Sequence, residues 1–210
     1  MFNEKEIIWI IITIIIFGFI IIFPAQTFNP LILIVPVLIV LTDVIVKKIA
    51  APNFNLEVKF KMWELYRYGF YERDHFKKPI PMGLILPFFL SLFSLGSLKI
   101  FTFLQFNYKD LHLRRALKAT GEGQHRRWHI NEKDPAFTAS WSHLALIALA
   151  VIGASFSFPE LAKYSIYYGL WNIIPFSQLD GSKMFFGSPV TWCFVLILYV
   201  IALATVFLLL

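Results

Sequence analysis

The ten residues NIIPFSQLDG, Asn172 to Gly181, lie in a chain that is otherwise dominated by Ile, Leu, Phe and Val. An amide, a proline and a carboxylate (Asn172, Pro175 and Asp180) interrupt the apolar sequence there. An ionisable residue inside a membrane segment is expensive, and it is usually kept for a function that involves a partner. We therefore expect Asp180 to mark a functional site.

The composition of the whole chain favours a membrane protein. Of its 210 residues, 58% are hydrophobic, whereas soluble domains are usually close to 45–50% apolar. Of the 19 Lys and Arg residues, eight lie in 47–79 and seven in 107–140. Basic clusters beside apolar spans are typical of cytoplasmic loops near anionic lipid, so we expect the bilayer as a partner and no nucleic acid. Cys193 is the only cysteine, which excludes an internal disulfide and a cysteine zinc cluster.

The apolar runs predict an all-α polytopic fold in which residues 1–210 form a single integral membrane domain. Long uncharged runs indicate about five transmembrane helices, over 7–23, 31–46, 141–158, 164–181 and 190–210. The acidic start Glu4-Lys5-Glu6 favours a retained first span over a signal peptide. The uncharged residues 24–30 are then outside by the positive-inside rule, and the N-terminus and the basic loops 47–79 and 107–140 are cytoplasmic.

Two further segments depart from simple spans. NLEVKFKMW (55–63) alternates apolar and polar residues, which predicts a short half-buried β-strand at the membrane surface. The run 80–106 carries Lys99 and several prolines and glycines, and its second half, KIFTFLQF, resembles a strand. A span here would place the two basic loops in opposite compartments. We therefore favour a re-entrant segment over an additional span, provided that other helices cover it.

This topology brings two carboxylates to one depth. Asp43 lies near the end of the second span and Asp180 near the end of the fourth. Both ends are cytoplasmic in the predicted arrangement, so the two side chains could share one site.

The stretch 172–181 resembles the second signature of the site-2 protease family of intramembrane zinc metalloproteases, Asn-x-x-Pro-x-x-x-Leu-Asp-Gly. The chain matches every defined position of that signature, with Asn172, Pro175, Leu179, Asp180 and Gly181. By this resemblance Asp180 would be the third zinc ligand and Asn172 would hold the reacting peptide carbonyl. Pro175, Leu179 and Gly181 would be structural positions of the motif. The resemblance covers roughly residues 31–210 and includes the strand of the NLEVKFKMW kind.

The family's first signature, His-Glu-x-x-His, is degenerate in this chain. The aligned stretch, TDVIV, has Thr42, Asp43 and Val46 where His, Glu and His would stand. Two imidazoles one helical turn apart would bind zinc while the acid polarises the water. Val46 has no lone pair and Thr42 is a poor zinc ligand, so Asp43 alone keeps the acid. We expect no cofactor, and zinc only if the protein is active.

Histidines elsewhere offer weak replacements. His125 and His129 in HRRWH have the required spacing, but Arg126 stands between them in a basic loop. His143, near the start of a span, is interpreted as an interfacial or packed histidine rather than a ligand.

Three functions follow from these observations. The first is a site-2 protease-like pseudoprotease that has lost catalysis and binds transmembrane segments of other proteins. The second is an active zinc endopeptidase with atypical ligands. The third is a small transporter or proton carrier that uses Asp43 and Asp180.

Overall fold

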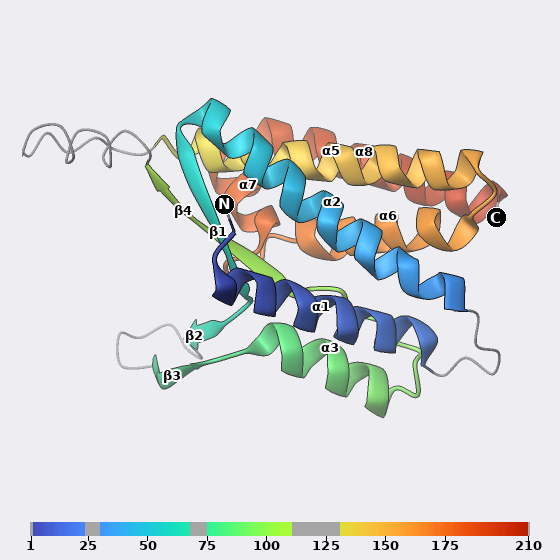
Figure 1. Ribbon diagram of the computed structural model, residues 1–210. Helices are drawn as coiled ribbons and strands as arrows, with labels where there is room; N and C mark the ends of the chain where they lie inside the picture. The colour runs from blue at the N-terminus through green and yellow to red at the C-terminus, as the bar shows by residue number, and fades with distance from the viewer. Residues whose placement is uncertain (1, 24–29, 68–74, 111–130, 210) are drawn as a thin grey trace, which may run out of the picture.

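The structure is a computed structural model that describes residues 2–23, 30–67, 75–110 and 131–209. The described part is mostly helical, with seven α-helices and two small two-stranded sheets. Figure 1 shows the long helices side by side and the strands gathered at one end, which we call the strand end. The N-terminus lies at the strand end and the C-terminus at the opposite end. The expected mostly helical fold with a short β element is therefore confirmed.

Five helices run between the two ends. They are α1 (Glu4–Ile22), α2 (Ile34–Ala50), α5 (Lys133–Ser155), α6 (Pro159–Ile173) and α8 (Pro189–Leu209). Three of them, α1, α5 and α8, are long and apolar enough to cross a membrane. With 17 and 15 residues, α2 and α6 are shorter than a typical span. The expected outer turn over 24–30 lies almost wholly outside the described residues.

The helix expected over 164–181 is two helices. α6 ends at Ile173, and α7 (Asp180–Gly187) begins after a short loop. Pro175 is the physical reason, because the residue before a proline is driven out of the helical region. Ile174 is indeed extended, with φ −62° and ψ 128°. Asp180 therefore opens a helix, whereas the predicted span over 164–181 placed it near a helix end.

Gly181 allows α7 to lie directly against the end of α6. A Cβ added at Gly181 would overlap the backbone carbonyl of Ile173, so only glycine fits this close approach. Leu179, the residue before α7, is almost completely buried. Trp192 secures the same junction by donating from Nε1 to the Ile173 carbonyl (2.9 Å). The path of the backbone between α6 and Asp180 thus depends on Pro175, Leu179 and Gly181.

The predicted strand is confirmed. β1 (Leu56–Met62) alternates buried and half-buried residues and pairs antiparallel with β4 (Leu104–Asp110), with Phe60 opposite Phe106. The basic loop expected over 47–79 is not all irregular. After β1 come β2 (Leu65–Arg67) and β3 (His75–Ile80), which pair with each other.

The segment 80–106 leaves the strand end and returns to it. α3 (Met82–Phe93) runs beside α1, and the chain then comes back in extended form to β4 (Figure 1). The returning backbone is covered by aromatic packing, since the Phe101 ring lies 4.7 Å from Phe17 on α1 and 5.9 Å from Tyr164 on α6. The chain therefore turns back as the sequence predicted, with Leu95, Ser97 and Leu98 exposed at the turn. A re-entrant placement of this segment in a membrane stays a prediction.

Candidate functional site

Five helices deliver polar side chains to one buried cluster near the strand end. α2 contributes Asp43 and Lys47, α5 contributes His143, and α7 contributes Asp180. Tyr168 on α6 and Tyr199 on α8 complete the set, which we call the buried cluster. All six side chains are buried. The expectation that Asp43 and Asp180 share one site is confirmed.

Lys47 bridges the two carboxylates. Its Nζ lies 2.7 Å from Oδ1 of Asp43 and 2.5 Å from Oδ2 of Asp180. Asp43 and Lys47 are one helical turn apart, which places both on the same face of α2. The Phe106 ring of the sheet lies 5.5 Å from the ammonium and shields it from solvent. The one buried ammonium of Lys47 therefore forms ion pairs with two buried carboxylates.

The remaining groups surround this pair. The Tyr168 hydroxyl donates to Oδ2 of Asp43 (3.2 Å), and Nδ1 of His143 is hydrogen-bonded to the Tyr199 hydroxyl (3.1 Å). Gly169 makes room for the Tyr199 ring, because an added Cβ would overlap it. Nε2 of His143 lies 3.8 Å from Oδ2 of Asp180, too far for a hydrogen bond. Within the described part of the chain, Nε2 of His143 and Oδ1 of Asp180 have no hydrogen-bond partner.

Asn172 adjoins the cluster but has its donors occupied. Its Nδ2 donates to the Phe101 carbonyl (3.1 Å) and to the Tyr168 carbonyl (2.8 Å). The side chain is 3% exposed and joins α6 to the extended segment before β4. The predicted role in holding a peptide carbonyl stays a prediction, and it would require these two bonds to open.

Of the three residues aligned with the first signature, Asp43 alone enters the buried cluster, together with Lys47 from the same helix. Thr42 and Val46 are half-buried, whereas Asp43 and Lys47 point at Asp180. Sequence reasoning missed Lys47 because it was counted with the basic loop. The i,i+4 spacing from Asp43 is the signal that could have found it. His143 is the packed histidine that was expected, while HRRWH falls outside the described residues.

The residues present do not fit a zinc ion. A catalytic zinc site normally presents three protein ligands and one open position. Here the two carboxylates already bind the Lys47 ammonium, which occupies the space between them. A cation that entered would have to displace a buried ammonium from both partners. No group of three His, Cys, Asp or Glu side chains with metal-binding geometry occurs in the described ranges.

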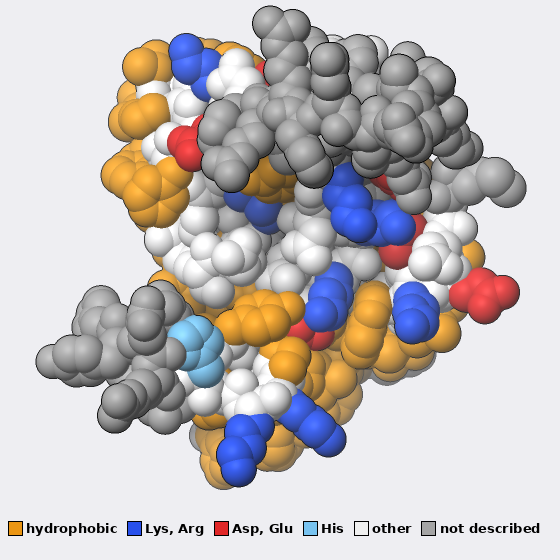
Figure 2. All heavy atoms as spheres, turned by 90° about the vertical axis from the view of Figure 1, so that its left-hand side faces the viewer, with side chains coloured by type: hydrophobic (Ala, Val, Ile, Leu, Met, Phe, Trp, Pro, Cys, Tyr) orange, Lys and Arg blue, Asp and Glu red, His pale blue; other side chains and the backbone are white. Residues whose placement is uncertain are grey.

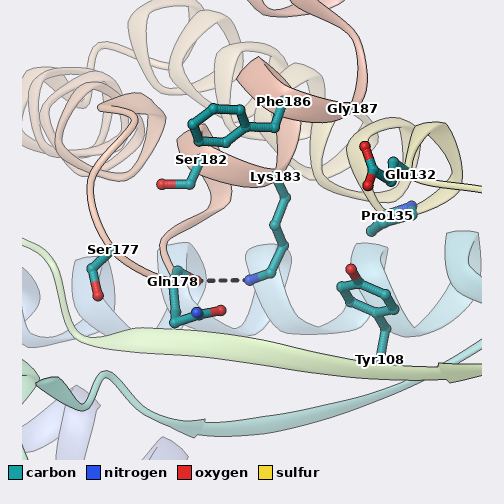
Figure 3. A pocket seen from close by; sticks show the side chains of 9 residues that line it. All are labelled: Tyr108, Glu132, Pro135, Ser177, Gln178, Ser182, Lys183, Phe186 and Gly187. Carbon is teal, nitrogen blue, oxygen red and sulfur yellow. Dashed lines mark hydrogen bonds between the residues drawn. The ribbon is translucent and has the colours of Figure 1, made fainter. Parts of the chain in front are cut away.

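A groove of about 430 Å³ opens beside the cluster on the other side of α7. Figure 3 shows Tyr108 of β4 on one wall, Ser182, Lys183 and Phe186 of α7 on another, and Gln178 of the preceding loop between them. Glu132 and Pro135, at the start of α5, close the far side. The lining is mixed polar and apolar, and Gln178 and Phe186 are exposed.

The edge of β4 beside the groove is accessible at Tyr108. The Phe60 amide donates to Oε1 of Glu6 (2.9 Å), so it points away from β4. Opposite residues of an antiparallel pair exchange both hydrogen bonds or neither, so the backbone N–H and C=O of Phe106 also point away from β1. By alternation those of Tyr108 do the same. Phe106 is 1% exposed, so of the two residues only the half-buried Tyr108 presents these groups to the groove. No backbone hydrogen bond from another described segment reaches these groups, and Figure 3 shows β4 between β1 and the loop that carries Gln178.

The strand end carries many of the positive charges of the described chain. Figure 2 views this end and shows several Lys and Arg side chains spread across it, with hydrophobic side chains between and around them. Exposed lysines there include Lys77 and Lys78 on β3 and Lys109 on β4.

Comparisons of the chain with protein-family models, with curated proteins and with solved structures give no match. The resemblance of residues 172–181 to the site-2 protease signature therefore remains a motif-level prediction.

Proposed function

We propose that this chain is a site-2 protease-like membrane protein that has exchanged catalysis for binding. In this proposal the Lys47 ammonium replaces the metal, no peptide bond is hydrolysed, and the groove beside α7 receives a segment of another membrane protein. The observation that carries the proposal is the bridge from Lys47 to both Asp43 and Asp180.

A resident ammonium supports loss of catalysis for a chemical reason. Metal-assisted hydrolysis needs a Lewis acid with an open coordination position, where water is activated. An ammonium has no coordination position to offer, and its protons here are directed at carboxylates. Asp43, the residue at the acid position, is bound to Lys47 and Tyr168 and is not free to take a proton from water.

The groove supports the binding half of the proposal. It lies next to Asp180 and combines an open strand edge with exposed apolar residues such as Phe186. An extended segment can add to an open edge through backbone hydrogen bonds, with its side chains entering the adjacent pocket. A transmembrane partner whose helix unwinds near the membrane surface presents such a segment.

The membrane arrangement belongs to the same proposal. α1, α5 and α8 cross the bilayer, and α2 and α6 cross with them because both pack against α5. The strand end with its lysines is cytoplasmic, so the N-terminus and the basic loops are cytoplasmic as well. The chain is then a multi-pass protein with α3 as a re-entrant element.

Site-specific crosslinking tests the binding half. A photocrosslinking amino acid at Gln178, exposed at the groove, should trap an extended or transmembrane segment of another membrane protein in native membranes. The same amino acid at Ile201, exposed on α8 and remote from the groove, should give only lipid adducts. Equal protein adducts at both positions would contradict a specific groove.

Elemental analysis tests the catalytic half. The purified protein should contain zinc far below one ion per chain, and added zinc should not change this. Stoichiometric zinc that disappears in Asp180→Ala would overturn the replacement of the metal by Lys47. It would instead favour the active enzyme with atypical ligands.

A proton carrier is the second candidate, and the two unpartnered buried atoms favour it. Oδ1 of Asp180 and Nε2 of His143 can each accept a proton without breaking a hydrogen bond with any described residue. Proton flux into vesicles that is lost in Asp43→Asn would support this candidate. Flux at the level of empty vesicles would exclude it.

A further inference from the structure

Lys183 is a cation with unused donors at the wall of the groove. Its Nζ donates to the backbone carbonyl of Gln178 (2.8 Å; dashed line in Figure 3). An ammonium has three donors, and no other hydrogen bond or ion pair of Lys183 is formed with the described residues. The side chain is half-buried and the Phe106 ring lies 3.8 Å from the ammonium.

The charges around Lys183 leave it without a counterion of its own. Asp180, on the same helix, is bound by Lys47. Glu132 lies on the opposite wall, is exposed and forms no ion pair with Lys183. Burial lowers the pKa of Lys183 to about 8, and Lys47 adds to this effect while Asp180 and Asp43 oppose it. An anion beside the ammonium would reverse that shift, because an opposite charge favours the charged form.

A second polar group on the same wall also lacks a partner. The Ser182 hydroxyl is buried, lines the groove, and makes no hydrogen bond with any residue of the described chain. Buried hydroxyls normally have a partner, so this unsatisfied one, on the residue that precedes Lys183, indicates a place for an acceptor.

We propose that the groove recognises an acidic side chain, an Asp or Glu within an extended segment of the partner, through Lys183 and Ser182. The segment adds to β4 at Tyr108, and its carboxylate lies against the Lys183 ammonium. A peptide is favoured over a lipid headgroup because a headgroup leaves the backbone groups of the β4 edge unused. This inference rests on the proposed function and names the chemistry of the partner.

Binding of two matched peptides tests the inference. The full chain in phosphatidylcholine nanodiscs is titrated with fluorescent Ac-Thr-Val-Glu-Val-Thr-NH₂ and with the same peptide carrying Gln in place of Glu. A charge-assisted hydrogen bond stabilises by about 1.5–3 kcal/mol. We therefore expect the Glu peptide to bind roughly tenfold more tightly or better, since 1.4 kcal/mol corresponds to a factor of ten.

Variants connect the preference to Lys183. Lys183→Met should remove the preference for Glu, and Lys183→Arg should keep it. In the wild type the preference should decline above pH 8 as Lys183 loses its proton, whereas Lys183→Arg should hold it to higher pH. Lys78→Met, a control at an exposed lysine of β3, should behave as the wild type.

Each other outcome overturns the inference. Equal binding of the two peptides, or binding of neither, would show that Lys183 does not select a carboxylate. Loss of the preference in nanodiscs that contain phosphatidylglycerol, but not in phosphatidylcholine alone, would assign Lys183 to a lipid headgroup instead. If crosslinks from Gln178 persist in these cases, the proposed function stands and only the acidic specificity fails.

Discussion

Two lysines lie against the same aromatic ring and have opposite surroundings. Lys47 and Lys183 lie 5.5 Å and 3.8 Å from the centre of Phe106. Lys47 is buried and its ammonium contacts two carboxylates. Lys183 is half-buried and its ammonium contacts one backbone carbonyl. α7 separates the two environments, because Asp180 faces the buried cluster while Lys183 faces the groove.

The comparison shows how a charge can serve structure or recognition. A buried ion whose partners are all internal holds helices together and has little left to offer a ligand. A half-buried ion with spare donors leaves part of its desolvation uncompensated until an anion arrives. Substitutions at the two lysines should therefore have very different effects.

The largest effect is expected for Lys47→Met. Removing one member of a buried ion pair leaves an uncompensated charge and typically destabilises by about 3–5 kcal/mol. Here two carboxylates would lose their shared cation, so a value near the upper end is expected. Chemical unfolding in detergent, followed by Trp fluorescence, measures the change. Lys183→Met is the matched control and should change the unfolding free energy by less than about 1 kcal/mol.

A triple variant sharpens this result. Asp43→Asn, Lys47→Met and Asp180→Asn together remove every charge of the bridge. Replacing a whole buried ionic group with neutral residues is often close to neutral for stability, so most of the loss in Lys47→Met should be recovered. Failure of the triple variant to recover would mean that shape rather than charge explains the effect of Lys47→Met.

Asn172→Leu should have the next largest effect. The substitution removes both donors of a buried amide and leaves the Phe101 carbonyl without its partner, which costs about 1–3 kcal/mol. The same unfolding measurement reports the loss. If Asn172→Leu left the stability unchanged, the two hydrogen bonds of Asn172 would not be structural, and the substrate-binding role that the motif implies would be favoured.

The fold was largely predictable from patterns of hydrophobicity. The alternation in 55–63 gave β1, and the interruptions in 80–106 indicated a segment that returns. The break after Ile173 was not predicted, because the apolar run continues through Pro175 and hides the end of α6. The local effect of a proline on the preceding residue decided the boundary there.

The site was predictable only in part. The predicted topology placed Asp43 and Asp180 at the same membrane depth. The same topology counted Lys47 with the solvated basic loop. A lysine directly after an apolar run looks like a snorkelling side chain. The direction that Lys47 takes depends on β1 and β4, whose rings cover the cluster, and this tertiary cover is not visible in the sequence of α2.

The smallest expected effect is a pH dependence of stability that belongs to Lys183. Its pKa is about 8 in the folded chain and about 10.5 when unfolded. Between these values the unfolded state binds more protons, so stability contributed by this site rises as pH increases from about 8 toward 10.5 and is constant below that window. The difference in unfolding free energy between the wild type and Lys183→Met, measured at pH 7 and pH 10, should therefore shift in favour of the wild type at pH 10. Because the side chain is partly exposed, the shift should be small, and Lys78→Met should show none. A shift of the opposite sign would mean that an internal anion already stabilises the Lys183 ammonium, and the contrast with Lys47 would disappear.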